Sequence, residues 1–107
     1  MTTPQQTDLT SALDRMWLQF RPQMEERLTI LEAAASALVS NTLSPNQRAA
    51  AASAAHKLAG VLGTFGLARG TNVARQLEQF YSASLNSSSA RQIDSLTAEL
   101  RSLIANR

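Results

Sequence analysis

Apolar residues recur every three or four positions along most of the chain, which is the period of an α-helix. Pro22 separates two such stripes before residue 40. Proline is accepted in the first turn of a helix but costs about 3 kcal/mol in a helix interior. The pattern therefore predicts either one kinked helix or a new helix that begins near Pro22. Thr7 or Asp8 would cap the helix that carries the first stripe. The first stripe consists of Leu9, Leu13, Met16, Trp17 and Phe20, and the second of Met24, Leu28, Leu31, Ala35 and Leu38.

A further helix is predicted after a short loop at residues 41–44. Ser44 is followed by a proline at the first helical position and by Gln47 at the third. This arrangement is typical of a capping box, in which the two side chains satisfy backbone amides at the helix start. We expect this helix to run from Pro45 to about Leu62.

Two more helices follow, separated by a polar loop at residues 86–89, and the last extends from about Ala90 to Ala105. No strand pattern, internal repeat or long linker interrupts the series. The sequence predicts an all-α fold, an antiparallel four-helix bundle with an additional or kinked N-terminal helix. We expect a flexible tail at residues 1–7 and a single domain at 8–107. In the helix before the loop at 86–89, the predicted inner face consists of Leu67, Val73, Ala74, Leu77, Phe80 and Tyr81. In the helix after that loop it consists of Ile93, Leu96, Leu100, Leu103 and Ile104.

Composition narrows the class of protein. A chain of 107 residues can bury a core without disulfides or metals, and the absence of cysteine excludes thiol catalysis and Cys-rich zinc sites. No apolar run approaches the roughly 20 residues that span a bilayer, and the polar start lacks the apolar stretch of a secretory signal. We expect a cytoplasmic protein that does not associate with membranes.

Charge argues against a nucleic-acid partner. The formal net charge is only +2, and the arginines are scattered along the chain. Proteins that bind nucleic acids concentrate their basic residues on one face. Binding to nucleic acid is therefore disfavoured.

His56 is the only histidine. A lone histidine in a helix is ordinarily a packed or incidentally exposed residue. Successive residues of an α-helix are rotated by about 100°, which places the apolar residues of this segment on the side opposite His56. We therefore expect His56 to face away from the core. The apolar residues on the opposite side are Ala51, Leu58, Val61, Leu62 and Phe65.

The residues around His56 on the same helical face all have small side chains. An ordinary solvent-facing surface carries Lys, Glu, Gln and Arg, and glycine in a helix interior costs about 1 kcal/mol relative to alanine. A flat patch of small residues would let a partner protein approach the imidazole, which is a good nucleophile with an unprotonated nitrogen at neutral pH. The predicted docking surface consists of Ala52, Ser53, Ala59, Gly60, Gly63 and Thr64.

Residues 55–66 resemble the signature of histidine-containing phosphotransfer domains. In that family the phosphorylated histidine is followed by an apolar residue at the second position, a lysine at the third, and glycines at the fourth, seventh and often tenth. Leu58, Gly60, Gly63 and Gly66 match this pattern. Downstream, the segment with Val73, Ala74, Leu77 and Glu78 resembles the family's next helix with its terminal Leu-Glu.

The resemblance implies that His56 carries a phosphoryl group between receiver domains of a phosphorelay. The implied partners are response-regulator receiver domains and a hybrid histidine kinase. The domain itself would be a monomeric carrier without independent catalytic activity, metal or cofactor, since Mg²⁺ is expected only in the partner receiver.

One departure from the family concerns the positive charge near the phosphohistidine. The usual lysine three positions after the histidine is replaced by Ala59. Lys57 and Arg69 are the candidates to stabilise the phosphate in its place. Arg75 is a further candidate, although a solvated surface cation is its more ordinary explanation.

Glu78 occupies a place where the family often has a polar residue close to the histidine. It is a candidate to accept the Nδ1–H of the imidazole and leave Nε2 to attack. The alternative is a surface charge just outside the apolar stripe.

Three other functions remain open from the sequence. The chain could be a docking bundle whose histidine carries no phosphate, as the missing lysine suggests. It could be a hydrolase or transferase with His56 as general base, although the only serine or carboxylate one turn away is Ser53, which has no oxyanion-site signature. A small nucleic-acid binder is the third option.

Overall fold

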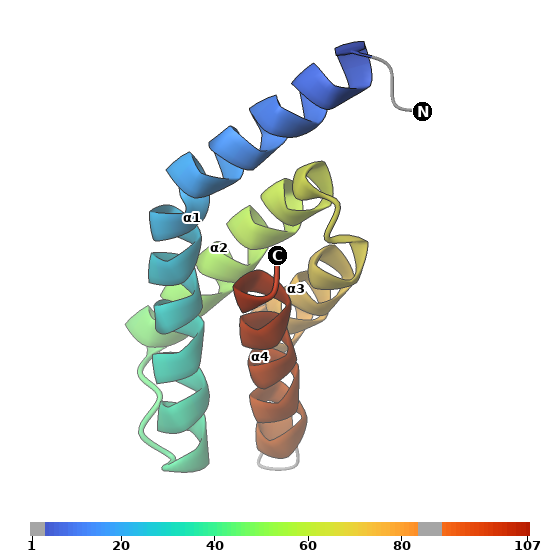
Figure 1. Cartoon of the computed structure of the whole chain (residues 1–107). Coiled ribbons are helices and arrows are strands. Elements are labelled where there is room, and N and C mark those ends of the chain that lie inside the picture. Colours follow the sequence, from blue (N-terminus) through green and yellow to red (C-terminus); the bar gives the residue numbers. More distant parts are fainter. Residues whose placement is uncertain (1–3, 84–88) are drawn as a thin grey trace.

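The structure is a computed structural model that describes residues 4–83 and 89–107. It confirms the all-α prediction, with four helices in the described residues and an elongated shape of 53 × 20 × 19 Å (Figure 1). The helices are α1 (Pro4–Val39), α2 (Pro45–Leu62), α3 (Ala68–Ser82) and α4 (Ser89–Ala105), and a short 3-10 helix, η1 (Gly63–Phe65), follows α2.

The two N-terminal stripes belong to one helix. Pro22 lies inside α1, and Figure 1 shows α1 bending in its light-blue part, around this residue. Because proline lacks an N–H and its ring crowds the preceding turn, a bend rather than a break is the result. The expected tail is described only in part: residues 4–7 form the first turn of α1, and residues 1–3 lie outside the described residues.

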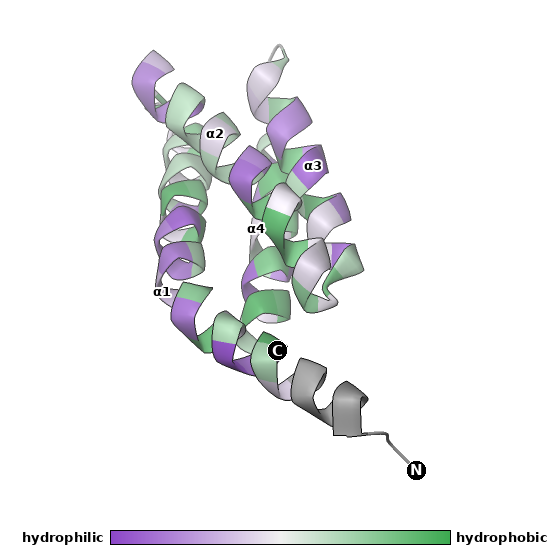
Figure 2. Cartoon of the chain, turned by 90° about the horizontal axis from the view of Figure 1, so that it is seen from above, coloured by the Kyte–Doolittle hydropathy of each residue, from purple (hydrophilic) through white to green (hydrophobic). Residues whose placement is uncertain are grey.

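The helices run alternately up and down (Figure 1). Hydrophobic and hydrophilic residues alternate along them (Figure 2), and buried apolar side chains from all four helices form one core. α2 packs on α1 and α3, and α4 packs on the other sides of the same two helices. This arrangement confirms the predicted antiparallel bundle. The side chains that are fully buried between the helices include Met24, Leu28, Leu31, Leu58, Leu62, Leu77, Ile93 and Leu100.

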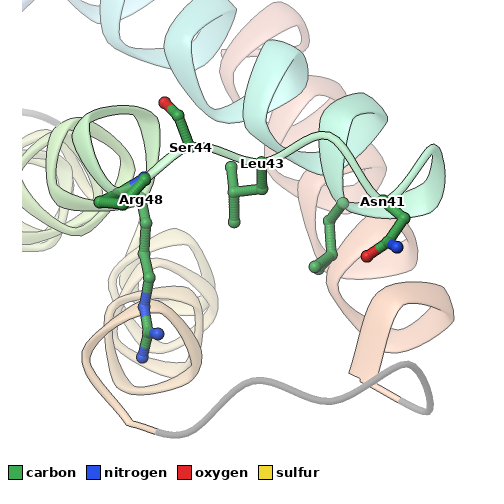
Figure 3. A pocket seen from close by; sticks show the side chains of 6 residues that line it. Asn41, Leu43, Ser44 and Arg48 are labelled. Carbon is green, nitrogen blue, oxygen red and sulfur yellow. The ribbon is translucent and has the colours of Figure 1, made fainter.

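The start of α2 is held by the predicted capping box. Ser44 Oγ accepts from the Gln47 backbone N–H at 3.1 Å, and the Ser44 N–H donates to Gln47 Oε1 at 3.2 Å. One turn into α2, Arg48 Nε donates to the Tyr81 carbonyl at 2.7 Å and ties this end of α2 to the end of α3 (Figure 3). Beside Arg48, a surface pocket of about 310 Å³ is lined by Leu38, Asn41, Leu43, Ser44, Pro45 and Arg48.

At the C-terminal end of α2, the adjoining helix η1 is held by contacts with α1 and with the last residue, Arg107. Arg107 Nε donates to the Phe65 carbonyl at 2.9 Å, and its guanidinium lies 5.1 Å from the Trp17 ring centre and 5.7 Å from that of Phe65. Asp14 pairs with the same guanidinium at 3.2 Å. These contacts hold η1 in place, so the helix that carries His56 is anchored at each end.

Two glycines near this end are expected to differ in their response to alanine. Gly66 has a φ of 80°, a left-handed conformation that disfavours any residue with a Cβ. A Cβ on Gly60, inside α2, would have no heavy atom within 4 Å. We expect Gly66→Ala to lower the free energy of unfolding by about 1 kcal/mol and Gly60→Ala to raise it by up to about 1 kcal/mol. Urea denaturation of the two variants measures both values, and shifts of the same sign would contradict this account.

Candidate functional site

His56 lies on the solvent side of α2. Its side chain is 75% exposed, whereas Ala51, Leu58 and Leu62 on the opposite side of the helix are fully buried. The burial pattern confirms that His56 faces away from the core. Among the predicted apolar set of this segment, Phe65 is also buried and Val61 is half-buried.

Glu78 of α3 is the direct neighbour of the imidazole. The distance from His56 Nδ1 to Glu78 Oε2 is 2.6 Å, and the Glu78 side chain is 29% exposed. An ionised carboxylate can only accept a hydrogen bond, so Nδ1 is the nitrogen that carries the proton. In the neutral ring the lone pair is then on Nε2, the nitrogen farther from Glu78.

Small residues let α2 and α3 approach closely beside this pair. Thr71 Oγ1 donates to the Ala59 carbonyl at 3.2 Å, and Gly70 lies against Leu62, whose Cδ1 would be 3.1 Å from an added Cβ. Thr71 was not anticipated from the sequence. Its spacing of seven residues from Glu78, which is two helical turns, was a usable signal, because it places the two on one face of α3.

The predicted docking surface is exposed in most of its positions. Ser53, Gly60, Gly63 and Thr64 are exposed, and Ala52 is half-buried. Ala59 requires a correction, because it is buried, with only 9% of its surface exposed. The helical projection put Ala59 near His56, but α3 packs over this side of α2 and Thr71 binds the Ala59 carbonyl.

The two cations named from the sequence lie in different places. Lys57 is exposed and borders a groove of about 240 Å³ between α1 and α2, together with Gln23, Glu26, Arg27 and Ile30. Arg69 is bound to Glu99 of α4 through two hydrogen bonds of 2.6 and 3.0 Å. These bonds raise the pKa of Arg69 and lower that of Glu99.

Arg69 is not brought to His56. It precedes Glu78 by nine residues, a rotation of about 180° at 100° per residue, so the two side chains leave opposite faces of α3. The pairing of Arg69 with Glu99 agrees with this placement. The phosphate-stabilising role expected for Arg69 therefore has no geometric support.

The chemistry available at the site is that of one nucleophile and one carboxylate. Among the described residues, no group of three or more His, Cys, Asp or Glu could hold a metal ion. Within the same part of the chain, no helix is long and apolar enough to cross a membrane. An exposed imidazole with an oriented free nitrogen is suited to accept a group from a docked partner.

Comparison with known families decides the classification. The family model of the Hpt domain matches residues 15–106, a range that contains both His56 and Glu78. The chain belongs to the Hpt domain family. Hpt domains are helical phosphotransfer modules of phosphorelays, and they interact with receiver domains and histidine kinases.

This Hpt domain also resembles a curated protein. It is 42% identical over 66 residues to Protein RcaC of Microchaete diplosiphon, an alignment that covers 62% of this chain and 10% of that protein. The match thus concerns a small part of RcaC. No solved structure matches the chain significantly.

Proposed function

We propose that this Hpt domain accepts a phosphoryl group on His56 from the phosphoaspartate of a receiver domain, or passes it to one. The observation that carries the proposal is the exposed imidazole whose Nδ1 lies 2.6 Å from Glu78 Oε2. In this arrangement Nε2 is the nucleophile and points away from the carboxylate that orients the ring.

The proposed transfer needs no proton acceptor for the attacking atom. The lone pair of Nε2 forms the new P–N bond, the bond between phosphorus and the aspartyl oxygen breaks, and the aspartate leaves as a carboxylate. The ring keeps its proton on Nδ1 and becomes positively charged. Glu78 stabilises that charge through the hydrogen bond at Nδ1, so its effect is larger in the transition state than in the free domain.

The receiver supplies the remaining catalytic groups. Mg²⁺ and cations in the receiver's own pocket would stabilise the transferring oxygens, as in other phosphoryl transfers. On this proposal the domain is a carrier with no independent catalytic activity and no cofactor of its own. Its partners are response-regulator receivers and a hybrid histidine kinase, with no role for nucleic acid, and it acts as a monomer in the cytoplasm.

The receiver would dock on the exposed small residues around His56. Ser53, Gly60, Gly63 and Thr64 supply this surface, with Ala52 at its edge. None of these side chains is longer than threonine, so the receiver's phosphoaspartate can reach Nε2 without displacing a long side chain.

Incubation with phosphorylated receiver domains tests the proposal. We expect transfer of label to this domain as a phosphate that is labile in acid and stable in base. A docking bundle without phosphotransfer is the alternative, and the alanine at the family's lysine position favours it. Receiver binding without any transfer would support that alternative and contradict the proposal.

Substitution of Glu78 tests the orienting role. Glu78→Ala leaves Nδ1 without its acceptor, and we expect the rate of phosphotransfer to fall about tenfold, the size of one lost hydrogen bond to a charged group. Glu78→Gln keeps an acceptor oxygen but not the charge, and its rate should be intermediate. Nitrogen NMR of the imidazole provides the independent measurement, because the Ala variant should lose the preference for the Nδ1–H tautomer. Equal rates in all three proteins would show that Glu78 is a surface charge.

A further inference from the structure

We propose that Arg75 of α3 binds the phosphoryl group on His56 and so supplies the positive charge that Ala59 cannot. This inference rests on the proposed function. It assigns the role to a residue of the neighbouring helix, in a different position from the lysine expected after the histidine.

The packing of α2 on α3 places Arg75 beside the site. His56 lies next to Glu78, and the Ala59 carbonyl binds Thr71, so the chain directions of the two helices are opposed. Arg75 comes three residues before Glu78 and four after Thr71, and residues at these spacings are neighbours on one helix face. Arg75 thus lies between the two contacts, level with the turn of α2 that follows His56.

No side chain of the described residues covers the position of α2 one turn after His56. The residue one turn after His56 on α2 is Gly60, which is exposed and whose added Cβ would meet no heavy atom within 4 Å. Arg75 is itself exposed. A long arginine side chain can therefore lie across Gly60 toward Nε2, where its planar guanidinium can donate two hydrogen bonds to phosphoryl oxygens.

The charges around the site favour Arg75 over the other cations. Arg75 has no ion-pair or hydrogen-bond partner among the described residues, whereas Arg69 is held by Glu99 on the opposite face of α3. Lys57 likewise has no ion-pair or hydrogen-bond partner in this part of the chain, but it borders the groove between α1 and α2. Three further arginines are engaged away from His56, namely Arg48, Arg101 and Arg107.

Phosphorylation creates the need for this cation. A phosphoryl group brings up to about two negative charges at neutral pH, and Glu78 already places a carboxylate at the other side of the ring. Arg75 would donate N–H groups to the phosphoryl oxygens without forming or breaking a covalent bond. Its effect is to shift the equilibrium of transfer toward the phosphorylated domain.

The test compares three charge-removing variants of equal kind, Arg75→Gln, Lys57→Gln and Arg91→Gln. Arg91 is an exposed arginine of α4 and controls for net charge. The measurements are the equilibrium constant for transfer from a phosphorylated receiver and the affinity for the unphosphorylated receiver. We expect Arg75→Gln to lower the equilibrium constant about tenfold, as for the loss of charge-assisted hydrogen bonds, and to change the receiver affinity less than about twofold. Arg75→Lys should restore part of the loss.

Other results would overturn the assignment. If Arg75→Gln behaves like Arg91→Gln, or if Lys57→Gln gives the larger loss, Arg75 does not bind the phosphoryl group. If receiver affinity falls as much as the equilibrium constant, Arg75 contacts the receiver instead. A wild-type domain that takes no label at all would refute the proposed function itself, and that outcome is distinct from any difference between variants.

Discussion

His56→Gln is expected to abolish phosphorylation of this Hpt domain completely. The variant removes the only imidazole in the chain, and an amide is not a nucleophile toward a phosphoaspartate. The fold should be unaffected, because the side chain is 75% exposed and exposed substitutions usually change stability by less than about 0.5 kcal/mol. The glutamine amide can also still donate to Glu78. Label transfer, circular dichroism and thermal melting measure these three expectations.

Lys57→Gln is the matched control for this experiment. Phosphorylated lysine is acid-labile like phosphohistidine, and Lys57 is the adjacent exposed residue. The control should keep the label while His56→Gln loses it. Residual acid-labile phosphate on the His56 variant would show that the acceptor is a different residue.

Gly60→Gln is expected to slow phosphotransfer at least tenfold while leaving the isolated domain folded. A side chain at this position points into open space and lies one helical turn from His56, so it would stand between the imidazole and a docked receiver. The same change replaces a glycine in a helix interior with a better helix former. We therefore expect an unchanged or higher melting temperature together with weaker receiver binding, measured by calorimetry and by transfer rates.

Ser95→Gln controls for the added side chain. Ser95 is exposed on α4, which packs on α1 and α3 rather than on the His56 side of α2. This control should bind the receiver like the wild type. Gly63 is a less clean position for the same test, because a Cβ there would lie 3.3 Å from Thr71 Oγ1. If Gly60→Gln unfolds the domain, or leaves transfer unchanged, the small residues around His56 do not serve partner access.

Much of the fold was predictable because local rules dominate in a helical bundle. The capping box at Ser44 fixes the start of α2, and the apolar repeat fixes which face of each helix is buried. The last helix was expected from about Ala90 and begins at Ser89, so Ser89 belongs to α4 and not to the loop predicted at 86–89; residues 86–88 lie outside the described residues. The sequence could not decide between a kink and a break at Pro22, because both satisfy the backbone rules for proline.

The sequence by itself determined that His56 faces away from the core, since the helical period relates it to its own apolar neighbours. Only the tertiary structure decided what lies beside it. Contacts between α2 and α3 depend on the distance and register of two helices, which no single-helix pattern contains. For this reason the sequence could not decide whether Glu78 is a surface charge or a neighbour of the imidazole, and the structure places it at Nδ1. Ala59 was predicted to lie on the surface, although α3 covers it. Arg69 was predicted to stabilise the phosphate, although its partner is Glu99.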